Sequence, residues 1–352
     1  MREFIKFFNN LNITKPTYKN IELIQPYIDQ YFKSHQYSTS RFSLLDLLTQ
    51  EKYHYVIIED TLIYLNLSIY KRKKGGSVTL YCAPINLNGD IKKEKDIIDY
   101  FHNHGVNVII SEEDMNRYDF KDWKYLSTFD DYIVSSEKLL DLQGKKFKHF
   151  RWRLNQYKTY LSSGEISEIL SINDKLNDDD IKSTVTLIKK WMKKCIDGGN
   201  RVWEDPTAYP KIFGKALYKL DRFQYFHIND KDNNNLVYEL TEKMTGEQIL
   251  STTGYRDYDF NFLPEANELI LLRGIHHWYN RLGNHFLLNL GYCGFNSKIK
   301  KQKLKYAPVK VLKHYKLESD TSKILKKFDK FDHLLKMKTK LLNKRVKSNW
   351  KK

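Results

Sequence analysis

The chain has few cysteines, and they are far apart. Cys82, Cys195 and Cys293 are the only three in 352 residues, and no Cys-x-x-Cys pair occurs. Isolated cysteines in odd number argue against both a disulfide scaffold and a cysteine-based zinc site. We therefore expect a reducing compartment and no bound metal.

Long apolar segments are also missing. No run approaches the roughly 20 apolar residues that a bilayer-spanning helix needs. Residues 1–15 lack the apolar core and cleavage site of a signal peptide. The sequence contains no Gly-x-Ser-x-Gly, His-Glu-x-x-His or P-loop pattern. With 41% hydrophobic residues, the chain nevertheless has enough apolar side chains to form cores. We expect a cytoplasmic protein.

What the sequence does have is positive charge, concentrated at one end. The net charge of the whole chain is +17. Residues 298–352 hold 20 lysines and arginines against four acids, a net charge of +16. The remaining 297 residues are therefore close to neutral. This distribution predicts a globular body with a surface for a polyanion, either a nucleic acid or an anionic lipid surface.

The order of predicted elements repeats in the two halves of the chain. Each half reads as a helix, an antiparallel meander, a second helix and a strand, which predicts an α/β fold of two tandem units with mixed sheets. The first half has strands at 53–60, 61–70, 77–85 and 106–113, and helices at 17–34 and 90–104. The second has strands at 223–230, 235–244, 247–258 and 285–292, and helices at 178–197 and 264–283.

Two segments carry sequence motifs that the apolar periodicity of helices and strands does not explain. They are about 150 residues apart, and each combines glycines with basic residues. The first contains Asp131-Tyr132-Ile133, Leu142-Gln143-Gly144-Lys145-Lys146 and Arg151-Trp152-Arg153-Leu154-Asn155, and the second contains Asn289-Leu290-Gly291, Gly294, Lys303 and Tyr306-Ala307-Pro308.

Together the two segments resemble the C-terminal domain of lysyl-phosphatidylglycerol synthases and its stand-alone relatives. The resemblance covers residues 100–320 and implies two tandem units of the Gcn5-related N-acyltransferase fold, which Fem-type peptidyltransferases share. We accordingly expect an N-terminal unit at 1–130 and a basic linking helix at 131–164. A C-terminal, active unit would follow at 165–318, and a basic amphipathic helix at 319–352.

Enzymes of this family move an aminoacyl group from an aminoacyl-tRNA to an amine or hydroxyl. The resemblance thus implies aminoacyl-tRNA as co-substrate and no cofactor, with the acceptor unknown. The pyrophosphate loop of coenzyme-A-dependent relatives, Arg/Gln-x-x-Gly-x-Gly/Ala, is missing, which favours tRNA over acyl-CoA. Two alternatives stay open: an N-acyltransferase that uses a CoA or carrier-protein thioester, and a non-catalytic protein that binds RNA or an anionic surface.

Proton transfer would need a carboxylate near the centre of the second sheet. By resemblance, this fold keeps its chemistry on the central strands, where Glu239 and Asp257 lie, with Tyr255 and Arg256 beside Asp257. The turn after Asn289 would position the acyl group. Each acid can equally be an ordinary salt-bridged strand residue.

Basic residues near both motifs are candidates for binding tRNA phosphates, because Lys and Arg neutralise phosphate charge and Arg can bind it bidentately. The same residues can instead form the solvated faces of two helices. The candidates are Lys145, Lys146, Arg151, Arg153, Arg256, Lys298, Lys300 and Lys303.

The predicted C-terminal helix has apolar residues at near-helical spacing and a second face made almost entirely of lysine. Three interpretations remain open for it: packing against the body, contact with tRNA, and peripheral contact with an anionic membrane.

Overall fold

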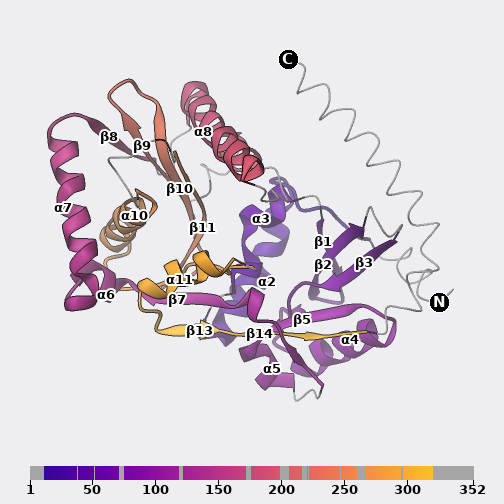
Figure 1. The fold of residues 1–352 in the computed structure, drawn as a ribbon. Coiled ribbons are helices and arrows are strands. Elements are labelled where there is room, and N and C mark those ends of the chain that lie inside the picture. Colours follow the sequence, from indigo (N-terminus) through magenta and orange to yellow (C-terminus); the bar gives the residue numbers. More distant parts are fainter. Residues whose placement is uncertain are drawn as a thin grey trace. The chain divides into compact units, whose positions relative to one another are not determined.

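The computed structural model describes two compact units (Figure 1). The first comprises residues 1–16, 51–126 and 314–352, and the second comprises residues 17–50 and 127–313. The described residues are 12–37, 39–50, 52–70, 75–118, 122–171, 176–198, 206–215, 220, 222–245, 247–257, 259, 266–294 and 296–319.

Each unit contains helices and one mixed sheet, so the predicted fold class is confirmed. The boundaries differ from the predicted ones because segment 131–164 is not only a linking helix. It begins with strand β7 (Asp131–Ser135), which pairs antiparallel with β12 (Leu287–Asn289) and β13 (Lys310–Leu312). Residues 17–50 also belong to the second unit. Of the predicted C-terminal helix, residues 320–352 lie outside the described residues.

The sheet of the first unit has the order β1-β2-β3-β5-β14-β6, and β4 pairs with β2. Helices α4 (Ile91–Asn103) and α5 (Glu112–Tyr118) accompany it. Apolar side chains of the strands and of α4 form its core, including Leu65, Val108 and Phe101. The strands are β1 (Tyr53–Ile58), β2 (Thr61–Tyr70), β3 (Gly75–Leu80), β4 (Ile85–Asn86), β5 (Asn107–Ser111), β6 (Lys124–Tyr125) and β14 (His314–Leu317).

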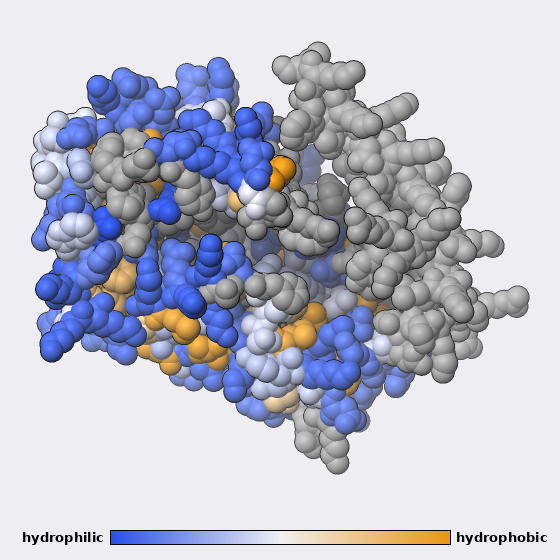
Figure 2. All heavy atoms as spheres, in the orientation of Figure 1, coloured by the Kyte–Doolittle hydropathy of each residue, from blue (hydrophilic) through white to orange (hydrophobic). Residues whose placement is uncertain are grey.

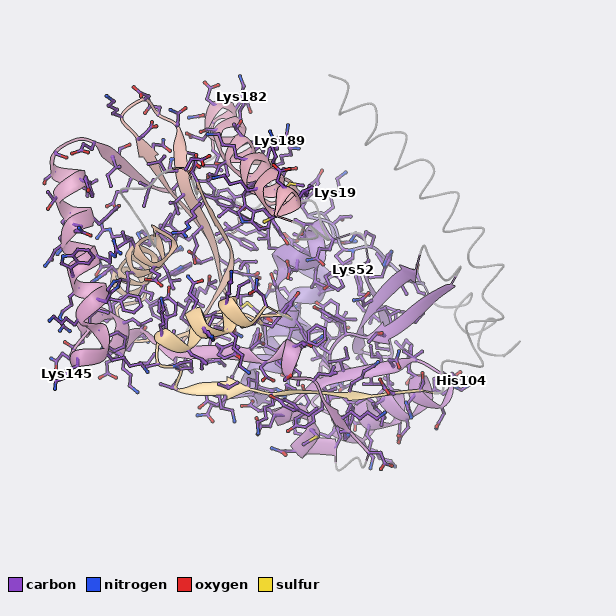
Figure 3. The ribbon with its side chains drawn as sticks, in the orientation of Figure 1. Lys19, Lys52, His104, Lys145, Lys182 and Lys189 are labelled. Carbon is purple, nitrogen blue, oxygen red and sulfur yellow. The ribbon has the colours of Figure 1, made fainter. Side chains whose placement is uncertain are left out.

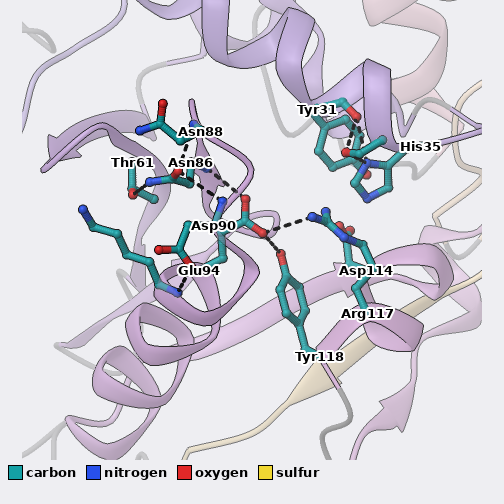
Figure 4. A network of polar contacts seen from close by, with 12 residues as sticks. Tyr31, His35, Thr61, Asn86, Asn88, Asp90, Glu94, Asp114, Arg117 and Tyr118 are labelled. Carbon is teal, nitrogen blue, oxygen red and sulfur yellow. Dashed lines mark hydrogen bonds and ion pairs between the residues drawn. The ribbon is translucent and has the colours of Figure 1, made fainter.

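A buried carboxyl fastens α4 inside the first unit (Figure 4). Glu94 accepts hydrogen bonds from the Asn86 N–H at 2.9 Å and the Tyr118 hydroxyl at 2.8 Å, and its carboxylate lies 3.3 Å from Arg117. Burial raises the pKa of Glu94 despite these partners. All three of these partners belong to the first unit, so we assign Glu94 a structural role.

The sheet of the second unit has the order β13-β7-β12-β11-β10-β9-β8. Its other strands are β8 (Ile166–Ser171), β9 (Phe223–Asp230), β10 (Asn235–Lys243) and β11 (Gln248–Arg256). All neighbours are antiparallel except β11 and β12, which run parallel. The helices are α2 (Ile21–Ser34), α3 (Leu44–Thr49), α6 (Ser136–Asp141), α7 (Lys148–Ser162), α8 (Asp178–Asp197), α9 (Ala208–Lys215), α10 (Ala266–Leu282) and α11 (Ser297–Lys305).

Helices cover both faces of this sheet (Figure 1). Successive strand residues point to opposite faces. Tyr225 of β9 hydrogen-bonds Thr184 of α8, whereas the next residue, Phe226, packs against Gly274 of α10. Helix α8 therefore lies on one face and α10 on the other. Asn177 and three aspartates in the first turn favour the start of α8, by capping and by the helix dipole.

A second buried carboxyl anchors the N-terminal segment to β10. Glu242 is fully buried and accepts hydrogen bonds from the Ser43 hydroxyl and the Leu44 N–H, both at 3.0 Å. Arg222 lies 3.3 Å from the same carboxylate. These bonds place the first turn of α3 against β10.

We expect Glu242→Ala to destabilise the protein by about 3 kcal/mol, because it leaves Arg222 and the start of α3 without their buried acceptor. Urea unfolding of the variant and the wild type would measure this. The matched control is Glu247→Ala, since Glu247 is exposed at the β10–β11 turn. A Glu242→Ala variant as stable as the control would contradict the assignment.

Candidate active site

The strands of the second sheet separate next to its centre. Strand β11 pairs with β12 only from Gln248 to Leu250, whereas β11 continues to Arg256 and β12 ends at Asn289. On its other side, the register of β11 with β10 skips Thr252, which marks a β-bulge. A bulge leaves the extra residue outside the ladder, and bulges are common near active sites. The Thr252 hydroxyl is buried and has no hydrogen-bond partner among the described residues.

The Glu239 carboxyl lies beside this bulge, on the same face as α10. It is 4% exposed and accepts a hydrogen bond from the Ser251 hydroxyl at 2.7 Å. Within the described part of the chain, no lysine, arginine or histidine pairs with it. Burial raises the pKa of Glu239 to about 8, against the lowering effect of Ser251. Such a carboxyl can hold and release a proton near neutral pH.

A glycine lies directly across the ladder from Glu239. Gly254 is exposed, and a Cβ atom on it would lie 3.3 Å from Glu239 Oε2. Sequence reasoning identified Glu239 but missed Ser251, Thr252 and Gly254. One signal was available, because a lone glycine inside a predicted strand often marks a bulge or a close approach to the backbone.

The structure does not bring Asp257 and Tyr255 to Glu239. Both face α8: Asp257 lies 3.2 Å from Lys190, and the Tyr255 ring is 4.5 Å from the Trp191 ring. Asp257 is thus a salt-bridged acid at the end of β11. Arg256 lies between them at the end of the same strand and is half-buried.

The two motif segments are neighbours in the structure. β7 begins with Asp131-Tyr132-Ile133, and it pairs with β12, where Asn289 stands opposite Ile133. Buried Asn289 accepts a hydrogen bond from the Gly291 N–H at 2.7 Å, which shapes the turn after β12. Gly291 has a φ of 69°, a conformation that favours glycine. Asn289 therefore holds the turn at the point where β11 and β12 diverge.

Lys303 of α11 contacts the main chain of the same turn. Its ammonium donates to the carbonyls of Leu290, Gly291 and Tyr292, the last two at 2.9 and 2.8 Å. Burial lowers the pKa of Lys303 to about 8. Sequence reasoning assigned this lysine to phosphate, but here its three donors are directed to main-chain carbonyls.

We expect Lys303→Met to destabilise the protein by about 2 kcal/mol, because three carbonyls lose a charged donor. Lys300→Met is a matched control, since Lys300 is exposed on the same helix and methionine and lysine have similar helix propensities. Thermal and urea unfolding would measure both. Equal stability of the two variants would show that the inward contacts of Lys303 contribute nothing.

Arg151 has a similar role at the first motif. Its guanidinium donates to the carbonyls of Leu142 and Gly144, the latter at 3.1 Å, across a turn in which both residues have positive φ. Arg153 lies over the Trp152 ring at 4.5 Å. Lys145 and Lys146 are exposed just before α7, and Figure 3 shows Lys145 at that end of the helix.

The remaining basic candidates lie on α11. Lys298 and Lys300 are exposed, and Asn296 caps the helix by accepting from the Lys298 and Ile299 N–H groups. Phe150 of α7 packs against Tyr306 after α11, with 5.3 Å between ring centroids. The structure therefore brings the two basic segments together at their adjoining ends.

A further group of lysines, on α8, did not enter the sequence prediction. Lys182, Lys189 and Lys193 are exposed on this helix, and hydrophilic side chains cover it in Figure 2. Figure 3 shows Lys182 and Lys189 along its outer side. They are separated from the Glu239 carboxyl by the sheet.

Two further features are absent from the described part of the chain. No group of three His, Cys, Asp or Glu side chains there could hold a metal ion. No helix within the same residues is long and apolar enough to cross a bilayer.

Comparison with known proteins identifies the fold. No protein-family model matches the chain, and no curated protein matches its sequence. Solved structures do match. A conserved Bacteroides thetaiotaomicron protein of unknown function is 14% identical, with a TM-score of 0.63 over 87% of this chain and 98% of that one. L-PGS from Bacillus licheniformis is 12% identical, with a TM-score of 0.55 over 83% and 91%. FemX is 9% identical, with a TM-score of 0.54 over 89% and 98%.

These likenesses extend over nearly the whole of each matched chain. The sequence identities are low, so the likenesses establish a shared fold. The resemblance that the two motif segments predicted is confirmed at this level.

Proposed function

We propose that the chain is an acyltransferase that moves an aminoacyl group from an aminoacyl-tRNA to an amine or hydroxyl acceptor. The reaction takes place in the second unit, beside the bulge of β11. The observation that carries the proposal is the Glu239 carboxyl, which is buried, lacks a described basic partner, and lies next to the point where β11 and β12 diverge.

An aminoacyl ester is already activated, so its transfer needs positioning, proton transfer and stabilisation of the oxyanion. Glu239 supplies the proton transfer, and the hydrogen bond from the Ser251 hydroxyl orients its carboxyl. The bulged Thr252 has a hydroxyl without a hydrogen-bond partner among the described residues, and this hydroxyl can donate to the developing oxyanion. The turn after Asn289 borders the same region and positions the acyl end.

The family resemblance and the basic surface support tRNA as the donor. Lys145, Lys146, Lys298 and Lys300 are exposed on two segments that adjoin, which suits a phosphate backbone. The likeness to L-PGS and FemX supports the same class.

Two other functions compete with this one. A CoA or carrier-protein thioester could supply the acyl group at the same carboxyl. A non-catalytic protein that binds RNA or an anionic surface would use the lysines and leave Glu239 without a role.

Incubation with radiolabelled aminoacyl-tRNAs and a cell extract as the acceptor source tests the proposal. We expect at least one donor to lose its aminoacyl group in an enzyme- and extract-dependent way. Radiolabelled acyl-CoAs form the parallel arm. Consumption of acyl-CoA alone would establish the thioester alternative, and no consumption in either arm would favour a binding protein.

A further inference from the structure

Gly254 leaves an approach to a carboxyl that is otherwise enclosed. On the α10 face, Glu239 stands between Phe226 of β9 and Gly254 of β11. Phe226 is fully buried, whereas Gly254 is exposed. Because glycine has no side chain, residue 254 places no side-chain atom over Glu239 Oε2 on the β11 side. No β12 residue pairs with β11 at Gly254, since that pairing ends at Leu250.

The glycine is not required by backbone conformation. Gly254 does not have a positive φ, so alanine or valine can adopt its backbone geometry. β-branched residues usually favour strands, and glycine weakens them. A Cβ atom at this paired strand position would lie 3.3 Å from a carboxyl oxygen of Glu239. The glycine therefore indicates that space is needed beside this oxygen.

The charge at this position favours one kind of ligand. A buried carboxylate is stable when a cation pairs with it, and the described residues place none beside Glu239. An alkylammonium supplies that cation and a transferable proton, whereas a hydroxyl supplies no charge and a phosphate would repel the carboxylate.

We propose that Gly254 forms the gap through which a primary amine on a slim, unbranched arm reaches Glu239, and that this amine is the acyl acceptor. This inference rests on the proposed acyl transfer and narrows its acceptor from an amine or hydroxyl to an amine. Gly254 is then the residue that determines which acceptors fit.

The reaction balances with Glu239 as the only acid–base group. When the ammonium binds, the Glu239 carboxyl releases its own proton to solvent. The ammonium then transfers a proton to the carboxylate and becomes the free amine beside a protonated Glu239. The nitrogen attacks the ester carbonyl carbon, a C–N bond forms, and the ester C–O bond breaks. Glu239 gives its proton to the leaving ribose oxygen and takes the proton that nitrogen releases. Glu239 ends protonated, as it began.

Carbodiimide labelling tests the approach without any donor. A slim, linear carbodiimide such as dimethylcarbodiimide adds to a protonated carboxyl. The adduct rearranges to a stable N-acylurea or is captured by an amine as an amide, and peptide mass spectrometry locates and counts both products. In the wild type at neutral pH we expect Glu239 to be labelled. Methylammonium should protect it, and tetramethylammonium, which has the same charge but four methyl groups, should not. Gly254→Ala should slow the labelling and Gly254→Val should slow it at least tenfold. Exposed Glu247, labelled at lower pH, is the internal control in every variant.

The outcomes separate this inference from the proposed function. Rapid labelling of Glu239 in Gly254→Val, with the control unchanged, would show that residue 254 does not control access to the carboxyl. Equal protection by methylammonium and tetramethylammonium would show that the site does not select a slim amine. If labelling and protection behave as expected but no aminoacyl-tRNA is consumed, the amine site stands and the donor assignment fails. If Gly254→Val keeps full transferase activity, the inference fails while the transferase stands.

Discussion

Glu239→Gln is expected to lower the rate of acyl transfer by roughly 10²- to 10⁴-fold, the usual contribution of a positioned acid–base group. Glutamine has the same shape and still accepts from the Ser251 hydroxyl, which lies 2.7 Å from Glu239. It cannot exchange a proton with the acceptor. The KM for the donor should change little, because the residues proposed to bind tRNA lie elsewhere. Single-turnover transfer from labelled aminoacyl-tRNA measures the effect.

Two further variants make this result specific. Glu247→Gln changes an exposed glutamate at the turn of the same hairpin and should leave the rate unchanged. Ser251→Ala removes the hydrogen bond to Glu239 but keeps the carboxyl, so we expect a smaller loss. A Glu239→Gln variant as active as Glu247→Gln would rule out acid–base catalysis by Glu239.

The second large effect concerns stability at different pH values. Burial raises the pKa of Glu239 from 4.5 to about 8, so the folded protein keeps a proton that the unfolded chain has released above pH 4.5. The stability that this proton contributes is complete below pH 4.5 and is lost as the pH rises through 8. The slope is about 1.4 kcal/mol per pH unit, or about 4 kcal/mol between pH 5 and 8.

Glu239→Gln has no such titration. We therefore expect the free energies of unfolding of wild type and variant to diverge steadily from pH 5 to 8, in favour of the variant at high pH. Urea unfolding of both proteins at matched pH gives the difference, in which all other titrating groups cancel. A difference that does not change with pH would mean that Glu239 is ionised in the folded state across that range.

The fold was predictable to the extent that it depends on local pattern. Element order predicted two α/β units with mixed sheets, and the motif spacing predicted the resemblance that the solved structures confirm at the level of the fold. The boundaries were not predictable, because they depend on pairing between distant strands. Asp131–Ser135 joins β12 and β13, and His314–Leu317 joins the sheet of the other unit.

The candidate site was likewise predictable only in part. The position of Glu239 on a central strand was predicted, but its separation from Asp257 depends on which face each side chain occupies, and the bulge at Thr252 alters that alternation. Lys303 and Arg151 look like phosphate ligands in the sequence because they are basic. Their contacts with main-chain carbonyls become visible only when the turns are folded.

The central claim is that the Glu239 carboxyl holds a proton near neutral pH, ready for transfer. The infrared carbonyl band of a protonated carboxylic acid, obtained as the difference between wild type and Glu239→Gln, measures this directly. We predict a band that persists at pH 7 and disappears with a midpoint near pH 8. A midpoint near the ordinary value of 4.5 would contradict the account, because Glu239 would then be an ionised carboxylate with no proton to give.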